Sequence, residues 1–299
     1  AVDVDGDNIP DFSDTETGLS DETVNAQIAR NIDMLEKATD LTLTQIGKET
    51  LRVRVLNQTG HKVPTGFPDG RRIWVNVKFM DIQDQVAVEL GEFDFATGSL
   101  VNPPDTKIYE IKLGIDAGQS AATGLPEGET FHFMLANVIA KDNRIPPRGY
   151  SNTVAAQNQT EVVGATYLDG QHWDDTFFAI PSCATQAIVT VYYQLVSDEY
   201  ITFLRDTNVT DNRGQVAFDL WDDPAVGNHG APVVMDMATL DIPGNPADLD
   251  DDAIVGIIDL LLLLANWGPC PPTGPCLGDI DCDGQVAIND FLAILKAWG

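Results

Sequence analysis

Basic residues are scarce in this sequence of 299 residues: 17 lysines and arginines stand against 46 aspartates and glutamates, a formal net charge of −29. Nucleic acids and anionic membrane surfaces are bound through clusters of lysine and arginine, so the composition argues against both as partners. A surplus of carboxylates attracts divalent cations, although part of it would also suit a solubilising surface. Hydrophobic residues form 43 % of the chain, which indicates a globular protein and not a disordered acidic tail.

A long apolar run is also missing. The most apolar stretch, residues 254–267, is shorter than the roughly 20 residues that span a bilayer, and it contains Asp259. We therefore expect no membrane insertion. The sequence starts at Ala1 and not at a methionine, as a chain does after removal of a signal peptide, and we expect a secreted, extracellular protein.

The four cysteines include no CxxC or CxxCH arrangement, which argues against structural zinc and covalently attached c-type haem. Cys270 and Cys276 bracket a proline-rich turn and predict a local disulfide, which implies an oxidising compartment. Whether Cys183 and Cys282 pair, within a chain or between chains, stays open.

The N-terminal part, residues 1–48, begins with an acidic, turn-rich segment and continues into a predicted helix at residues 20–38. Ser20 can cap this helix, and Asp21 and Glu22 lie in its first turn, where the helix dipole favours negative charge. Apolar residues at helical spacing share one face. They are Val24, Ile28, Ile32 and Leu35.

Between residues 49 and 242 apolar and polar residues alternate with a period of two, which is typical of strands with one buried face. The alternating runs are 51–55, 73–79, 131–135 and 189–195. Turn residues separate them and little helical pattern lies between. The fold class is therefore predicted as mainly β, with an antiparallel β-sandwich body, ordered loops such as 137–186, and a linker at 241–246.

The last segment, residues 246–299, contains an internal repeat in which an acidic loop and an apolar helix occur twice. The motif that begins at Asp248 and ends at Gly268 recurs from Asp279 to Gly299, 31 residues later. A repeat of this kind indicates a paired loop–helix module, joined by the turn between Cys270 and Cys276.

Both acidic loops match the spacing of a calcium-binding loop, which supplies oxygen ligands at positions 1, 3, 5, 7, 9 and 12 of about twelve residues and turns sharply at a sixth-position glycine. The second loop has Gly284 at this turn, whereas the first has Ala253, so we expect a weaker or reshaped first site. Position 7 contributes a backbone carbonyl. The predicted ligands are Asp248, Asp250, Asp252, Ile254 and Asp259 in the first loop, and Asp279, Asp281, Asp283, Gln285 and Asp290 in the second.

A third loop with this spacing lies at the N-terminus, with Asn8 at its sixth position. Aspartate-rich turns are also common as plain solvated loops, but three loops that each have an acid at the twelfth position favour calcium as the cofactor. Without metal the carboxylates would repel one another, so both ends should be ordered only when calcium is present. The predicted ligands here are Asp3, Asp5, Asp7, Ile9, Asp11 and Asp14.

The repeat at 246–299, with the form DxDxDGxxxxxDFLxxLxxWG, resembles a dockerin domain. Dockerins are non-catalytic modules that bind a cohesin, itself a β-sandwich, through their helices. The resemblance implies that residues 260–264 and 291–295 supply the helix faces, part of which would contact a partner. The N-terminal loop is similar to a single thrombospondin type-3 calcium repeat.

The middle region resembles the haem-free, β-rich C-terminal part of extracellular multihaem cytochrome-like proteins. The likeness is carried by residues 59–72, 141–149 and 167–175. Members of that family carry CxxCH sites upstream, and this sequence has none. It would then be a fragment of a longer precursor or a member without haems, and electron transfer is not implied.

The leading hypothesis is a non-enzymatic extracellular structural protein whose calcium-ordered ends dock onto another copy or onto a cohesin-like β-sandwich, with a head-to-tail filament as one result. One alternative is a docking module of a multihaem electron-transfer system. Another is a dockerin-borne polysaccharide hydrolase, since carboxylate pairs suit glycoside hydrolysis. No acid lies in a recognisable catalytic setting, and the scattered histidines are expected to be structural. They are His61, His132, His172 and His229.

Overall fold

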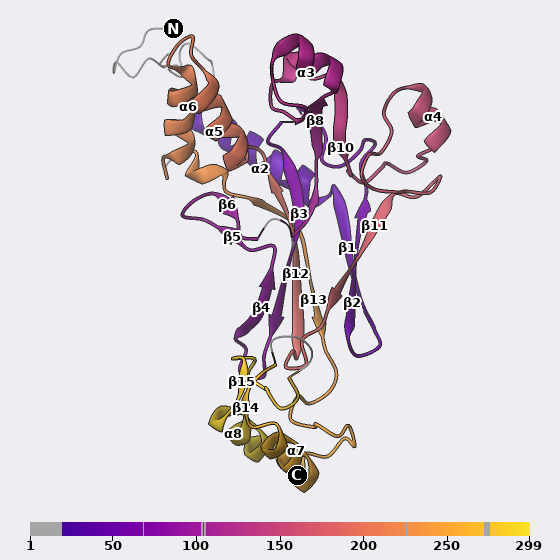
Figure 1. Ribbon diagram of the computed structural model, residues 1–299, viewed down its shortest axis with the longest axis vertical. Helices are drawn as coiled ribbons and strands as arrows, with labels where there is room; N and C mark the ends of the chain where they lie inside the picture. The colour runs from indigo at the N-terminus through magenta and orange to yellow at the C-terminus, as the bar shows by residue number, and fades with distance from the viewer. Residues whose placement is uncertain (1–19, 68, 103, 105, 225, 272–275) are drawn as a thin grey trace.

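The computed structural model describes residues 20–67, 69–102, 104, 106–224, 226–271 and 276–299. The predicted fold class is confirmed: the protein is mainly β, with two antiparallel sheets packed face to face. Helices gather at one end of this body, and the C-terminal loop–helix units lie at the other (Figure 1). None of the helices in the described ranges is long and apolar enough to cross a membrane.

The smaller sheet of the sandwich has the strand order β1-β2-β11, and every pairing in it is antiparallel. Its central strand carries Leu51, Val53 and Val55 on the buried face, and Arg52 and Arg54 are only partly covered, as the alternation predicted. The body begins before the expected boundary at residue 49, because β1 precedes it and pairs along its whole length with β2. The bounds are β1 (Thr39–Ile46), β2 (Thr50–Asn57) and β11 (Trp173–Ala179).

The larger sheet has the order β13-β12-β3-β4, and β7 also pairs with β3. The central strand β3 is buried on both faces. Val75 and Val77 face the other sheet, while Trp74 on the opposite face packs against Phe93 and Tyr192. The bounds are β3 (Arg72–Met80), β4 (Val86–Leu90), β7 (Lys107–Tyr109), β12 (Gln186–Gln194) and β13 (Val233–Asp241).

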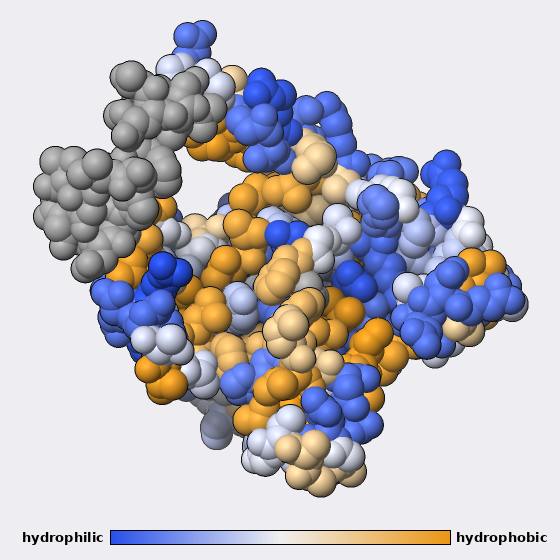
Figure 2. Space-filling model, turned by 90° about the horizontal axis from the view of Figure 1, so that it is seen from above, coloured by the Kyte–Doolittle hydropathy of each residue, from blue (hydrophilic) through white to orange (hydrophobic). Residues whose placement is uncertain are grey.

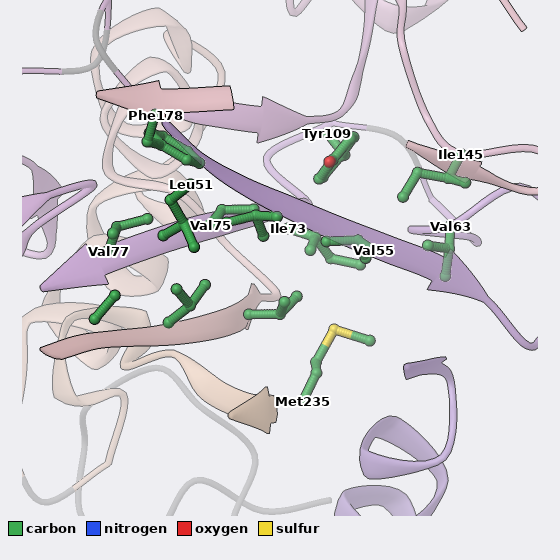
Figure 3. Close-up of a cluster of buried hydrophobic side chains, with 14 of the residues drawn as sticks. Leu51, Val55, Val63, Ile73, Val75, Val77, Tyr109, Ile145, Phe178 and Met235 are labelled. Atoms are coloured by element: carbon green, nitrogen blue, oxygen red, sulfur yellow. The ribbon is translucent and has the colours of Figure 1, made fainter. Parts of the chain in front are cut away.

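The main core lies between these two sheets (Figure 3). Leu51 and Val55 from β2 and Phe178 from β11 point toward Val75 and Val77 of β3. Because aliphatic side chains from both sheets interdigitate here, burial of this layer supplies most of the apolar stabilisation of the body.

Smaller elements surround the sandwich. A third sheet has the order β10-β8-β9, and two short ribbons are formed by β5 with β6 and by β14 with β15. The remaining strands are β5 (Phe93–Asp94), β6 (Ser99–Leu100), β8 (Ile111–Ile115), β9 (Gly128–Glu129), β10 (Val138–Asp142), β14 (Gly268–Pro269) and β15 (Gln285–Val286). The helices are α2 (Asp21–Glu36), α3 (Ala117–Thr123), α4 (Asn152–Gln157), α5 (Asp198–Thr207), α6 (Arg213–Asp222), α7 (Ile257–Ala265) and α8 (Ile288–Ala297), with 3-10 turns η2 (Phe133–Leu135) and η3 (Asn228–Gly230).

Two expectations for the body are wrong. The run 131–135 forms no strand: it leads into the 3-10 turn η2, because Phe131 packs on the rings of Tyr200 and Phe203 in α5 and does not join a sheet. The segment 137–186 is not a loop only, since it contributes β10, α4 and β11.

Helices α5 and α6 were not predicted. They pack against each other at the end of the body where α3 also lies (Figure 1). The sequence did hold a signal for α5, since Ser197 caps it by accepting a hydrogen bond from the Tyr200 backbone N–H, and Asp198 and Glu199 occupy the first turn.

Helix α2 confirms the predicted N-terminal helix, and the Ser20 side chain caps it by accepting from the Thr23 backbone N–H. Its apolar face is mostly open to solvent. Val24, Ile28 and Ile32 are exposed, and only Leu35 packs against the core of the sandwich.

The position of the core can be tested with two valine-to-alanine substitutions on neighbouring strands. Val77 on β3 is fully buried, so Val77→Ala should lower the free energy of unfolding by about 2 kcal/mol through lost burial and a residual cavity. Val86 on β4 is 47 % exposed, and Val86→Ala should change it by less than about 0.5 kcal/mol. Urea unfolding followed by circular dichroism measures both, and equal losses would contradict this core.

Candidate functional site

The C-terminal module consists of two loop–helix units whose matching residues fill its core. Leu263 of α7 and Ile294 of α8 are both fully buried, as are Val255 and Val286 just before the helices. Both members of each pair are 31 residues apart, so the repeat in the sequence is a repeat in space. The ribbon of β14 and β15 joins the two units.

The acid at position 12 of each loop is buried and folds the loop around itself. Asp290 accepts hydrogen bonds from the backbone N–H groups of Ile280 (2.6 Å), Asp281 (3.3 Å) and Ala287 (2.7 Å). Asp259 does the same in the first loop. Its donors are Leu249 (2.6 Å), Asp250 (3.2 Å) and Gly256 (2.7 Å).

The acids at positions 1 and 5 also make the same hydrogen bonds in both loops. The side chain at position 1, Asp248 or Asp279, accepts from the backbone N–H groups of positions 5 and 6. The side chain at position 5, Asp252 or Asp283, accepts from the N–H two residues further on, at Ile254 (2.8 Å) or Gln285 (3.0 Å). Both loops therefore follow one hydrogen-bonding plan.

Ala253 does not reshape the first loop. Its φ is 69°, in the left-handed region, and Gly284 at the matching position has φ 88°. Position 4 is also left-handed in both loops, with φ 60° at Asp251 and 55° at Cys282. The first loop therefore follows the path of the second, and Ala253 carries the steric cost that the glycine avoids.

Three carboxylates converge in each loop. The oxygens of Asp248, Asp250 and Asp259 lie within 4.8 Å of one another, and so do those of the second-loop set. Calcium–oxygen bonds are about 2.4 Å long, so two ligands of one ion lie at most about 4.8 Å apart. The donor set and its spacing fit calcium. The second-loop set is Asp279, Asp281 and Asp290.

Asp252 and Asp283 at position 5 lie outside these converging sets, although both were predicted as ligands. Cys270 and Cys276 also come close to Asp279, but they form a disulfide and so offer no thiolate to a metal. The predicted N-terminal ligands, from Asp3 to Asp14, lie outside the described residues.

Burial and mutual repulsion raise the pKa of three carboxylates in these loops. Burial, followed by the charges of neighbouring aspartates, raises the pKa of Asp279 and of Asp281. The pKa of Asp250 is raised in the same way. Burial also acts against ionisation of Asp259, but the N–H groups that it accepts outweigh this and lower its pKa. Asp259 is thus stabilised by the backbone, whereas no positive charge offsets the raised pKa of Asp250, Asp279 and Asp281.

The module is fastened to the body through position 4 of each loop. Cys282 forms a disulfide with Cys183, which is buried in the connection between β11 and β12. Asp251, at the matching position, forms an ion pair with Lys48 in the β1–β2 turn. The pairing that the sequence left open is therefore Cys183 with Cys282 within one chain, and the predicted Cys270–Cys276 disulfide is confirmed.

Two matching stripes of apolar side chains remain exposed on α7, α8 and the residues that follow them. Corresponding residues show nearly the same exposure: 57 and 57 % for Ile257 and Ile288, 54 and 54 % for Leu261 and Leu292. The other two pairs are Leu264 with Leu295 (49 and 47 %) and Trp267 with Trp298 (49 and 46 %). Both helices lie at the tip of the molecule, beyond the sandwich (Figure 1).

The predicted helix faces at 260–264 and 291–295 divide between two roles. Leu263 and Ile294 fill the module core, and Leu260 and Phe291 pack partly against it. The exposed stripes extend beyond those ranges to an isoleucine at the start of each helix and a tryptophan after its end. The period of 31 residues marked these positions in the sequence, because each apolar residue recurs there.

The four histidines form no cluster within the described ranges. His229 contacts the Asp222 carboxylate through Nε2 (3.0 Å) and the Phe95 carbonyl through Nδ1 (3.0 Å). His172 Nδ1 lies 3.1 Å from the Gly170 carbonyl. These contacts suit the structural roles expected for them.

No protein-family model matches the chain, and no curated protein sequence matches it. Among solved structures, a penta-heme cytochrome c552 from Thermochromatium tepidum superposes with a TM-score of 0.41 and 14 % identity, over 71 % of this chain and 41 % of that one. The chain therefore spans less than half the length of the cytochrome. A likeness this distant carries no inference about function.

Backbone strain in the first loop can be tested by exchanging the two sixth-position residues. Gly284→Ala should destabilise the module by about 1 kcal/mol, because it places a Cβ at φ 88°, and Ala253→Gly should relieve a similar cost. No atom lies within 4 Å of a Cβ at Gly284, so crowding does not add to the effect. Thermal unfolding in the presence of a chelator measures both.

The matched control is Gly256→Ala. Gly256 has φ −142° and ψ −158°, the same values as Ala287 in the second unit, so alanine is already tolerated in this conformation. This variant should lose no stability. If Gly284→Ala is as neutral as Gly256→Ala, the left-handed conformation at position 6 is contradicted.

Proposed function

We propose that this protein is a non-enzymatic, calcium-binding docking protein of the extracellular space. In this proposal calcium binds in both C-terminal loops and fixes α7 and α8, and their exposed apolar stripes bind a partner. The observation that carries the proposal is the matched exposure of four apolar residues on each unit, directly beside loops whose acids converge at calcium spacing. Apolar patches of this kind on a surface indicate a protein interface.

The link between metal and docking surface runs through the position-12 acids. Asp259 and Asp290 belong both to a loop and to the first turn of the helix that follows it. A cation bound by these carboxylates would therefore act on the helix start directly. It would also favour the ionised form of Asp250, Asp279 and Asp281, whose pKa is raised first by burial and then by the charges of neighbouring aspartates.

The proposed partner is a β-sandwich, either a cohesin-like protein or the body of a second copy. A second copy is favoured by the division of the molecule, which has a sandwich along its length and helices α7 and α8 at one tip (Figure 1). These helices carry the exposed stripes. Contact between a tip and a different surface of the next copy is heterologous and does not close, so it would build a filament. The two disulfides suit an extracellular location.

Calcium binding should raise the stability of the module. At a calcium concentration about 100 times the Kd, the gain is about 2.7 kcal/mol, and a chelator should reverse it. Isothermal titration should show loss of one site in Asp281→Asn, while Asp206→Asn on α5, an exposed aspartate outside the loops, should keep every site. The absence of both calcium heat and a shift in Tm would refute calcium binding.

Docking can be tested on the stripes. With calcium present, the native protein should form larger particles in light scattering and electron microscopy, and the double variant Leu261→Asp with Leu292→Asp should not. Leu168→Asp is the matched control, since Leu168 is 71 % exposed on the body. Monodisperse native monomers both with calcium and with chelator would rule out self-assembly and leave a separate sandwich protein as the proposed partner.

A further inference from the structure

A pocket of about 420 Å³ is lined in part by β8 and α5. These two elements lie at the end of the body opposite to α7 and α8 (Figure 1). Four segments build it: the turn at residues 69–72, residues 110–113 with strand β8, residues 129–131 from the end of β9 onward, and the first two turns of α5 with its cap. The turn belongs to the segment 59–72 that the sequence analysis singled out, and the proposed docking function gives this segment no role.

The turn is held in place by Gly70. Its φ is 74°, and a Cβ there would lie 2.8 Å from the Cβ of Tyr200, so only glycine allows this close approach to α5. The Gly70 carbonyl also accepts a hydrogen bond from the Ser197 backbone N–H (2.9 Å) at the cap of α5. These contacts fix Asp69 at the pocket.

Asp69 is 95 % buried, with a relative exposure of 5 %, and its Oδ2 has no hydrogen-bond partner among the described residues. A buried carboxylate without a partner is costly, and such groups are normally paired. Burial raises the pKa of Asp69, and no positive group offsets this effect.

Three cations lie along the pocket. Arg71 donates to the Thr65 carbonyl and lies over the Tyr193 ring, while its buried Nε has no hydrogen-bond partner among the described residues. Arg72 bonds to Gln194 (2.8 Å) and pairs with Asp198 (3.3 Å) and Glu199 (3.2 Å). Lys112 pairs with Glu129 (3.2 Å) and lies 3.7 Å from Glu110. Arg72 and Lys112 are therefore not available to Asp69, and no ion pair joins Arg71 to it among the described residues.

An aromatic wall adjoins this carboxylate. Phe131 and Phe203 line the pocket with ring centroids 5.5 Å apart, and Tyr200 lies 5.3 Å from Phe131. Seen from this end of the molecule, apolar side chains gather in the middle of the face and hydrophilic residues at its edge (Figure 2). Phe67 is half exposed and extends the wall, with its ring centroid 6.2 Å from that of Tyr200 and 5.7 Å from that of Phe133.

We propose that this pocket binds an organic amine, with the ammonium group paired to Asp69 and an apolar body against Phe131 and Phe203. An ammonium donates the hydrogen bonds and the positive charge that the carboxylate lacks. Aromatic faces attract the cation as well as its hydrocarbon part. The ligand class is a small aryl-alkyl amine, which the volume of the pocket accommodates. This site is separate from the proposed calcium and docking functions.

Isothermal titration of the full chain tests the proposal, in a buffer that contains calcium and no primary amine. The probes are 2-phenylethylamine, the neutral 2-phenylethanol and the anionic phenylacetate, which share a shape and differ in charge. The amine should bind about tenfold or more tightly than the alcohol, because a charge-assisted hydrogen bond to a buried group is worth at least that factor, and phenylacetate should not bind.

Asp69→Asn should weaken amine binding about tenfold or more. The matched control is Glu129→Gln, which removes a carboxylate from the same pocket that is exposed and already paired with Lys112. It should change the affinity less than about threefold. Absence of amine binding, equal binding of amine and alcohol, or an unaltered affinity in a folded Asp69→Asn protein would overturn the proposal. If Asp69→Asn does not fold, the three probes on the native chain decide.

Discussion

Repulsion between carboxylates packed into two short loops is the constraint on which the C-terminal module depends. In each loop three of them converge within 4.8 Å, far closer than like charges settle without compensation. Backbone N–H groups compensate Asp259 and Asp290, while the pKa of Asp250, Asp279 and Asp281 stays raised. The uncompensated part is the physical basis of the proposed calcium dependence, since a divalent cation is the simplest group that can neutralise it.

The two loop–helix units correspond in three respects: their hydrogen bonds, the burial of their helices and their contacts with the body. The loops share a hydrogen-bonding plan, and the helices share their buried and exposed positions. Position 4 of each loop also meets the body, once through the Cys183–Cys282 disulfide and once through Lys48 and Asp251. A module with two equivalent faces offers a partner two equivalent ways to bind. The attachment to the body differs between the units, since the second unit is held by a covalent bond and the first by an ion pair.

Much of this fold could be predicted where the sequence is periodic. Alternation in β2, β3 and β12 identified the sandwich, and the 31-residue period identified the module. The prediction failed at 131–135, where Phe131 packs on the ring of Tyr200 in α5 and no strand forms. Helix α5 had not been predicted either. Long-range pairing was also beyond the sequence: nothing near Cys183 indicates Cys282, and Asp69 resembles any turn aspartate until the fold buries it.

The disulfide between Cys183 and Cys282 also decides how the molecule would carry mechanical load. It closes a covalent ring across a sequence separation of 99 residues, which contains β12, α5, α6, β13, the linker at 241–246 and the first loop–helix unit with α7. Tension applied to α8 would pass from Cys282 directly to Cys183 and so into the sandwich. The linker at 241–246, which contains prolines and a glycine and lies inside the ring, would then be bypassed by this pull.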